Sequence, residues 1–232
     1  MLYYESVSVF TAFEDIVPIE PDDSRRQAEY QSLRAAGAGP VERENGARGP
    51  WEIIDGKGIV FSAPHNVEQI RDEKPKRAEK GTGALAFGLA RHVGGAALRT
   101  VDRQSGDPNW DIGSPYVGRA HELSGGRPIV DLHMMRPRGV EICVGLGPLA
   151  ALADGLWQPL VDEAVKAGLR VSVNWPFGAS SRTITGQSQQ AGIPAVQVEL
   201  TWDCFDPNHA ATARAWSAMA RAAERITATA LG

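Results

Sequence analysis

The stretch Pro128-Ile129-Val130-Asp131-Leu132 decides the fold expected for this chain. Its apolar residues run almost without interruption, which is typical of a strand that is covered on both faces of a sheet. The run Leu169-Arg170-Val171-Ser172-Val173 favours a second strand of this kind. From Trp51 onward such short runs alternate with longer segments rich in alanine and leucine. This alternation predicts a three-layer α/β/α sandwich around a central mixed, mostly parallel sheet.

The 232 residues are expected to form one domain. Strands are predicted at 58–63, 97–102, 128–132, 140–144, 169–174 and 195–200. Helices are predicted at 78–92, 148–167 and 207–230. Residues 1–50 combine a β-prone start, a polar helix-compatible stretch at 22–36 and an exit rich in glycine and proline. They are interpreted as an N-terminal arm that packs on the domain or on a second copy of the chain, so a homo-oligomer stays open.

Composition and charge exclude several classes of protein. The net charge is −4 and the acidic and basic residues are interleaved, so no basic face for nucleic acid is expected. Cys143 and Cys204 are too few for a disulfide framework and lie too far apart for a structural zinc site. No secretory signal and no apolar run of membrane-spanning length is recognisable. We therefore expect a soluble, cytoplasmic protein without nucleic-acid or membrane partners.

Reactive side chains follow several of the predicted strands. His65 and Glu68 come after the first, in Ser62-Ala63-Pro64-His65-Asn66-Val67-Glu68, and His133 directly follows the strand at 128–132. Ligands of α/β sheets collect beyond the carboxyl ends of strands, and two imidazoles with one carboxylate are the ligand set of a catalytic zinc. Taken alone, His65 and Glu68 are equally typical of a hydrogen-bonded surface pair. Glu199, near the end of the last strand, is left free to act as a base.

The predicted Zn²⁺ site has a simple chemical logic. Zinc lowers the pKa of water and polarises a carbonyl, while a nearby carboxylate takes the water proton and passes it to the leaving amine. Asp131 is expected to accept the second imidazole N–H, either of His65 or of His133. The other histidines, His92, His121 and His209, are expected to lie away from the metal.

Two segments in the second half of the chain are the segment from Gly168 to Gly178, with its Asn174-Trp175-Pro176-Phe177 turn, and Gln197-Val198-Glu199 in the last strand. Together they resemble the C-terminal half of the N-formylglutamate amidohydrolase family. Further motifs stand in the order that this family shares with zinc carboxypeptidases and aspartoacylases: Pro64-His65, Arg103, Asp107-Pro108-Asn109 and Asp131-Leu132-His133. The resemblance extends from about residue 58 to about residue 205.

This resemblance implies a zinc-dependent hydrolase that cleaves the amide bond of a small N-acyl amino acid. It implies that His65, Glu68 and His133 bind Zn²⁺ and that Glu199 is the general base. Arg103 would polarise the scissile carbonyl and stabilise its oxyanion. It also implies the three-layer fold of the zinc carboxypeptidases.

Two departures from the family pattern concern the substrate. Relatives commonly carry arginine after the asparagine, whereas this chain has Asn109-Trp110. A planar indole cannot replace a guanidinium that binds a carboxylate. The threonine loop reads Ala179-Ser180-Ser181-Arg182-Thr183 and brings a new arginine. The residues predicted to contact the substrate are Asn109, Trp110, Arg182, Thr183 and Arg136, with Arg138 as a further candidate for the carboxylate clamp.

Two alternatives remain open from the sequence. Trp110 suits an apolar or aromatic group, which favours a zinc peptidase or deacylase that acts on a larger peptide-like or biosynthetic amide. The other alternative is a non-catalytic binding protein of the same fold. The two histidines and two glutamates argue against a binding protein. Metal content would distinguish a binding protein from the amidohydrolase and from the peptidase or deacylase.

Overall fold

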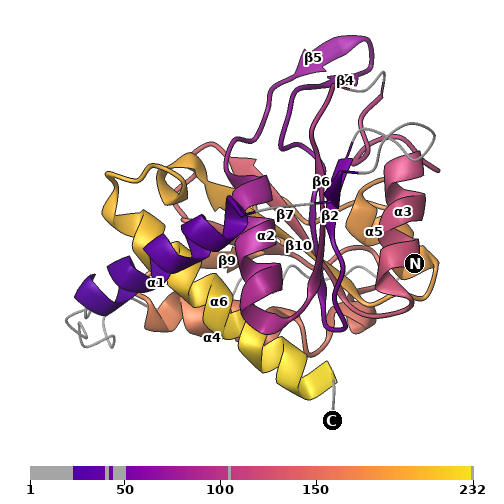
Figure 1. The fold of residues 1–232 in the computed structure, drawn as a ribbon. Helices are drawn as coiled ribbons and strands as arrows, with labels where there is room; N and C mark the ends of the chain where they lie inside the picture. The colour runs from indigo at the N-terminus through magenta and orange to yellow at the C-terminus, as the bar shows by residue number, and fades with distance from the viewer. Residues whose placement is uncertain (1–22, 40–41, 44–50, 104–105, 231–232) are drawn as a thin grey trace.

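The computed structural model describes residues 23–39, 42–43, 51–103 and 106–230. Within these ranges an eight-stranded sheet separates two layers of helices (Figure 1). From one edge to the other the strands are β1 (Glu42–Arg43), β2 (Trp51–Ile54), β6 (Ala96–Thr100), β3 (Val60–Ala63), β7 (Ile129–Met135), β10 (Ala195–Thr201), β8 (Ile142–Gly145) and β9 (Val171–Val173). The predicted three-layer α/β/α sandwich is confirmed.

The sheet is mixed, with a parallel centre. Strands β6, β3, β7 and β10 run parallel to one another, whereas β2 joins β6, and β8 joins β10, in antiparallel fashion. The edge strand β9 is parallel to β8, and β1 is antiparallel to β2. Because β3, β7 and β10 are neighbours and parallel, their carboxyl ends meet at one edge of the sheet, where α/β proteins bind ligands.

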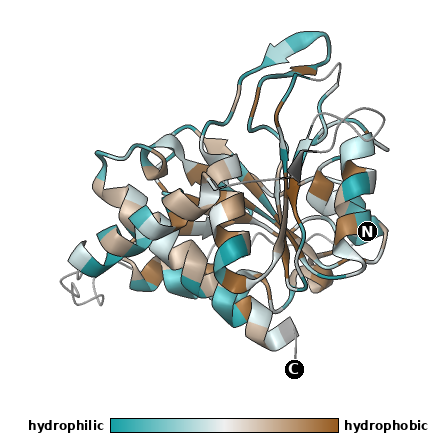
Figure 2. Ribbon diagram, viewed as in Figure 1, coloured by the Kyte–Doolittle hydropathy of each residue, from teal (hydrophilic) through white to brown (hydrophobic). Residues whose placement is uncertain are grey.

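Helices cover both faces of the sheet. One layer consists of α1 (Asp23–Gly37), α2 (Thr82–Val93), α4 (Trp157–Lys166) and α6 (Ala210–Ala230). The opposite layer consists of α3 (Pro115–Ser124) and α5 (Ile184–Gln190). Two short 3₁₀ helices are η3 (Ala150–Ala153) and η4 (Trp202–Cys204), and a separate hairpin is formed by β4 (Gln69–Arg71) and β5 (Lys74–Lys76). This hairpin projects beyond the sheet and is largely hydrophilic, while the central strands are hydrophobic (Figures 1 and 2).

Alternation along two strands places the polar groups of the candidate site on one face. In β7, Val130 and Leu132 pack into the larger core with α1, α2, α4 and α6, whereas Ile129 packs into the core with α3 and α5. Asp131 and His133 follow Ile129 at intervals of two residues, so they share its face. The same rule places Gln197 and Glu199 of β10 with Ala195, on the side of α5.

The predicted elements are present, with shifted ends. The helix expected at 78–92 begins at Thr82, and the one expected at 148–167 is divided into η3 and α4 at Gly155, whose φ is 79°. Helices α3 and α5 were not predicted. Each begins at an N-cap residue, which is a signal that hydrophobic periodicity does not contain. The side chain of Ser114 accepts a hydrogen bond from Tyr116 N, and that of Thr183 accepts one from Gly186 N.

The predicted arm at 1–50 lies largely outside the described residues. Its helix α1 packs against α2 and α6, and the ring of Tyr30 meets that of Trp216 edge-on at 5.2 Å between centroids. Its packing on a second copy stays a prediction. Among the described residues, no helix combines the length and apolarity needed to cross a membrane.

The contact between α1 and α2 gives a test of the packing. A Cβ added to Gly88 of α2 would lie 2.5 Å from the carbonyl oxygen of Leu33 in α1, whereas one added to Gly118 of α3 would meet nothing within 4 Å. Helix propensity alone makes Gly→Ala stabilising by about 0.8–1 kcal/mol. We expect Gly118→Ala to show this gain and Gly88→Ala to destabilise the protein by about 1–3 kcal/mol through overpacking. Urea unfolding measures both, and equal stabilisation by the two substitutions would contradict the α1–α2 packing.

Candidate active site

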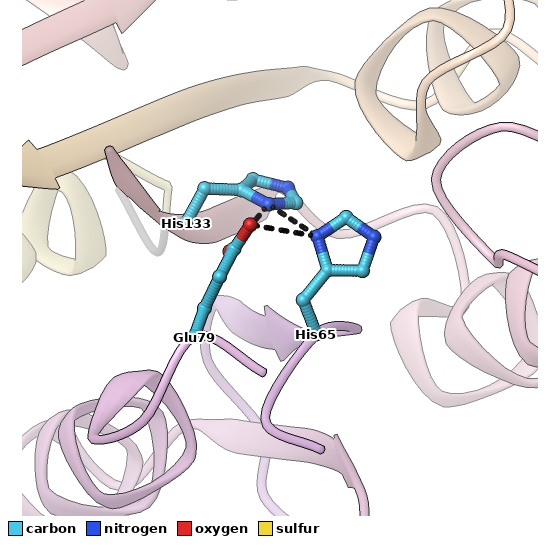
Figure 3. A group of neighbouring side chains, drawn as sticks. All are labelled: His65, Glu79 and His133. Carbon is cyan, nitrogen blue, oxygen red and sulfur yellow. Dashed lines mark hydrogen bonds and ion pairs between the residues drawn. The ribbon is translucent and has the colours of Figure 1, made fainter. Parts of the chain in front are cut away.

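Three buried side chains from separate segments converge at the carboxyl edge of the sheet. His65 Nδ1 lies 3.1 Å from Glu79 Oε1 and 3.2 Å from His133 Nδ1. His133 Nδ1 lies 3.1 Å from Glu79 Oε2. Figure 3 shows the two rings and the carboxylate pointing toward one another. Among the described residues, they form a group of three ligand atoms within 4.8 Å of one another that could hold a metal ion.

Backbone contacts hold the segments that carry these side chains. His65 follows the end of β3, and His133 lies in the adjacent strand β7. Glu79 precedes α2, and its N–H donates to the carbonyl of His65 at 2.7 Å. Asn66 donates from Nδ2 to the carbonyl of Thr100 and accepts from Gly83 N, which joins the turn after β3 to the start of α2. The positions of the ligands therefore depend on the ends of three elements.

The outer nitrogens of both imidazoles are bound to carboxylates. His65 Nε2 is 2.7 Å from Asp107 Oδ1, and His133 Nε2 is 2.9 Å from Asp131 Oδ2. A carboxylate oxygen only accepts, so Nε2 donates its proton to the aspartate in each ring, which leaves Nδ1, the nitrogen that faces Glu79, as the one that could bind a metal. This is the usual orientation of metal-binding histidines. Of the two partners considered for Asp131, the structure selects His133.

The carboxylates and imidazoles of the group shift one another's pKa values. Burial alone would raise the pKa of Glu79, but the two neighbouring imidazoles hold it well below its usual value. Burial would lower the pKa of His133, but Asp131 and Glu79 hold it well above its usual value. Three carboxylates thus surround two imidazoles. The spacing of the inner atoms is also close to the distance of about 3.3 Å between ligands around a tetrahedral zinc with bonds of about 2.0–2.1 Å. The donor set therefore fits a divalent metal.

The structure places Glu79, and not the predicted ligand Glu68, beside the two histidines. Glu68 forms an ion pair with Arg103 at 3.1 Å, and the two side chains are 44% and 51% exposed. A glutamate three residues after a histidine shares its direction on a helix, but residues 64–67 form turns and bends. The chain instead passes through the β4–β5 hairpin and returns a carboxylate 14 residues after His65. Arg103, the ion-pair partner of Glu68, is not among the residues that line the cavity.

Glu199 lies beside the group of potential ligands. It pairs with His133 across β10 and β7 and is buried. Burial raises the pKa of Glu199 to about 7, although the charges of the neighbouring histidines oppose this shift. Gln197 Nε2 donates to Glu199 Oε1 at 2.9 Å and so orients the carboxylate. A carboxyl group that titrates near neutrality is suited to general base and acid catalysis.

A cavity of about 570 Å³ opens in front of these groups. It is lined by His65, Glu79, His133 and Glu199, by four of the residues predicted to contact the substrate (Asn109, Trp110, Thr183 and Arg136), and by Arg138, the further candidate for the carboxylate clamp. Asn109 also supports the site, because its backbone N–H donates to Asp107 Oδ1 at 2.9 Å and its Oδ1 accepts from Ile184 N. Sequence reasoning missed Arg71 and Lys76 of the hairpin, which line the cavity as well.

Trp110 binds two arginines at the cavity. The guanidinium carbons of Arg71 and Arg182 lie 5.0 Å and 4.4 Å from the centroid of its ring. Arg182 Nε also donates to the carbonyl of Trp110, and the indole N–H of Trp110 donates to Asp72. Arg182, the first candidate for the substrate clamp, is therefore occupied by Trp110 and does not line the cavity. Trp110 connects the hairpin to the loop before α5.

Solved structures with the same fold are known. A crystal structure of N-formylglutamate amidohydrolase from Ralstonia eutropha JMP134 matches with a TM-score of 0.57 at 15% identity, covering 78% of this chain and 98% of that chain. A bacteriophage poly-gamma-glutamate hydrolase matches with a TM-score of 0.52 at 16% identity, covering 80% and 91%. A gene product from Agrobacterium tumefaciens matches with a TM-score of 0.53 at 15% identity, covering 76% and 94%.

No protein-family model and no curated protein matches the sequence. The likeness to the three solved structures is one of fold, because all three are at most 16% identical to this chain. The predicted resemblance to N-formylglutamate amidohydrolase holds at that level.

Two matched variants test whether Glu79 or Glu68 binds the metal. We expect Glu79→Gln to weaken the binding of Zn²⁺ by about tenfold or more, because the amide loses the negative charge that faces both Nδ1 atoms. Glu68→Gln is expected to bind Zn²⁺ as tightly as the unaltered chain. Competition with a chromophoric chelator measures both affinities. Weaker binding by Glu68→Gln with unchanged binding by Glu79→Gln would restore the ligand set expected from the sequence.

Proposed function

We propose that this protein is a zinc-dependent amidohydrolase that cleaves the amide bond of a small N-acyl amino acid. The observation that carries the proposal is the position of Glu199, a buried carboxyl group with a pKa of about 7, in the same cavity as His65, Glu79 and His133. A metal-assisted hydrolase needs a base next to the side chains that bind a divalent cation. The similar folds that bear the names of amide hydrolases support this class.

The metal would be held by His65 Nδ1, His133 Nδ1 and the Glu79 carboxylate. When bound, it supplies a Lewis acid that lowers the pKa of water and polarises the substrate carbonyl. Asp107 and Asp131 keep the protons on the outer nitrogens, so both inner nitrogens remain available as ligands.

Glu199 moves the proton during hydrolysis. Its carboxylate takes a proton from the attacking water as the new bond to the carbonyl carbon forms. It then gives that proton to the amide nitrogen as the C–N bond breaks, which releases a carboxylate and an amine. Gln197 holds one oxygen of Glu199 through a hydrogen bond of 2.9 Å, which leaves the other oxygen to accept the proton of the reacting water.

A basic side chain is also needed for the charge that develops on the carbonyl oxygen. Arg103 was predicted for this role, but Arg71 is the better candidate because it lines the cavity. Asp107 accepts from Arg71 Nε at 2.7 Å and binds His65 with its other oxygen, so Arg71 is fixed relative to the metal ligands.

A second candidate function is the hydrolysis of a larger, peptide-like amide. The cavity wall contains Trp110, Pro176 and Phe177, and Phe177 is 37% exposed. Such a surface favours an apolar or aromatic group next to the scissile bond. One similar fold is named for poly-gamma-glutamate, which supports a polymeric amide as the alternative substrate.

Glu199→Gln separates the base from the metal ligands. The amide keeps the shape of the carboxylate but cannot accept the water proton, so we expect the rate of amide hydrolysis to fall by about two to four orders of magnitude. Zinc content should stay unchanged. Amine release from N-formyl-L-glutamate and from N-acyl derivatives of apolar amino acids measures the rate. Loss of zinc from this variant would make Glu199 a ligand instead of the base.

The pH dependence of hydrolysis has a defined sign. A base works only when it is deprotonated, so kcat/KM should fall about tenfold per pH unit below the pKa of Glu199. The inflection is expected no higher than about pH 7. The positive charge of a bound metal would lower the pKa of the Glu199 carboxyl group further. The residual activity of Glu199→Gln should lack this inflection. An identical acid limb in the variant and the unaltered chain would show that another group is the base.

A further inference from the structure

Four buried side-chain oxygens in the described part of the chain form no hydrogen bond with another group of the protein. They are Asp131 Oδ1 of β7, Gln197 Oε1 of β10, Thr185 Oγ1 of α5 and Thr227 Oγ1 of α6. A buried acceptor without a donor costs free energy, and buried water molecules are the usual partners of such groups. The first three oxygens belong to elements that pack against one another, because α5 contacts both β7 and β10.

Asp131 and Gln197 are direct neighbours in the sheet. They are partners in the register of β7 and β10, and both side chains point to the face that α5 covers. Neighbouring strands lie about 4.8 Å apart, so the two side chains start from positions that a single small molecule can span. Both residues are at most 4% exposed, so bulk water does not satisfy their unpaired oxygens.

Helix α5 runs antiparallel to β10 above this pair. At its carboxyl end, Gln189 Nε2 donates to the carbonyl of Ala195 at 2.9 Å, which holds the last turn of α5 over the start of β10. At its amino end, the N–H of Ile184 donates to Asn109 Oδ1, and Asn109 lines the cavity at the carboxyl edge of the sheet. The helix therefore extends from the start of β10 toward the candidate active site.

This path places Thr185 over Gln197. Thr185 precedes Gln189 by four residues, so it lies on the same face of the helix and about 6 Å closer to the cavity. Gln197 follows Ala195 by two residues, which is about 6.6 Å along the strand in the same direction. Thr185 is fully buried, so its hydroxyl lies between α5 and the neighbouring pair of Asp131 and Gln197.

The hydrogen-bonding capacities of the three groups do not match without a further molecule. Asp131 Oδ1 only accepts, and so does Gln197 Oε1, which is the amide oxygen because Nε2 donates to Glu199. The Thr185 hydroxyl has one proton, so it can serve only one of the two acceptors directly. A water molecule satisfies all three groups, because it donates one proton to each acceptor and accepts from the hydroxyl.

We propose that Asp131 Oδ1, Gln197 Oε1 and Thr185 Oγ1 bind one buried water molecule behind the candidate active site. The other oxygen of Asp131 is bound to His133 Nε2, and the amide N–H of Gln197 holds Glu199. The water therefore joins the support of a metal-ligand candidate to the support of the base. Thr185 becomes a positioning residue for both, although it does not line the cavity.

A crystal structure of the unaltered chain, at a resolution that shows ordered water, tests the site directly. We expect one water molecule with its oxygen about 2.6–3.0 Å from Asp131 Oδ1, Gln197 Oε1 and Thr185 Oγ1. A direct hydrogen bond from Thr185 to either acceptor, or no density between the three oxygens, would overturn the proposal.

Thr185→Val tests the positioning role, because valine keeps the shape of threonine and removes the hydroxyl. Its effect on zinc rests on the ligand set of the proposed function. We expect the water to be lost and the binding of Zn²⁺ to weaken by about three- to tenfold, since the groups that orient metal ligands set their affinity. Thr185→Ser keeps the hydroxyl and should bind Zn²⁺ as the unaltered chain does. Competition with a chromophoric chelator measures each affinity.

Thr227→Val is the matched control. It also removes an unpaired buried hydroxyl from a helix, but α6 lies in the opposite helical layer, away from Asp131 and Gln197. It should leave the affinity for Zn²⁺ unchanged. Equal affinities of Thr185→Val and Thr227→Val would overturn the positioning role of Thr185.

The water site and the proposed hydrolysis can fail separately. A water molecule bound by the three oxygens in a chain that cleaves no amide would support the site, and only the enzymatic function would fail. Hydrolysis of amides by a chain whose three oxygens enclose no water would support the enzyme and overturn the site.

Discussion

The candidate site depends on the close, buried contact between two imidazole nitrogens and one carboxylate. His65, His133 and Glu79 are at most 6% exposed, and their inner atoms lie 3.1–3.2 Å apart. Burying ionisable groups costs several kcal/mol each unless their hydrogen bonds and charges are compensated. Here Asp107 and Asp131 compensate the histidines, and the N–H of Met134 donates to Glu79 at 3.0 Å.

The order and direction of the strands bring these three side chains together. Strands β3 and β7 are parallel neighbours, so a residue beyond the end of β3 and a residue near the end of β7 reach the same edge. The period of two along β7 and β10 then turns His133 and Glu199 to one face, while Leu132 and Val198 fill the opposite core. A shift of one residue in either strand would exchange these faces, so the core and the site fix the register together.

The predicted site residues that the structure brings together are those that belong to apolar strands. His65, His133 and Glu199 stand in or just after such runs, so their position follows from the strand itself. Glu79 could not be found in this way, because its place depends on a hairpin of polar residues that leaves the sheet and returns. Arg71, which lines the cavity whereas Arg103 does not, belongs to the same hairpin. Helices α3 and α5 were missed because they are short, although their N-cap residues Ser114 and Thr183 marked their starts.

Anomalous diffraction from crystals of the zinc-loaded chain tests the central claim most directly. Data collected on both sides of the zinc absorption edge locate the metal independently of any assay. The structure predicts one peak per chain, bonded at about 2.0–2.2 Å to His65 Nδ1, His133 Nδ1 and the Glu79 carboxylate. A peak bonded to Glu68, a peak outside the cavity, or no peak in zinc-replete crystals would contradict it.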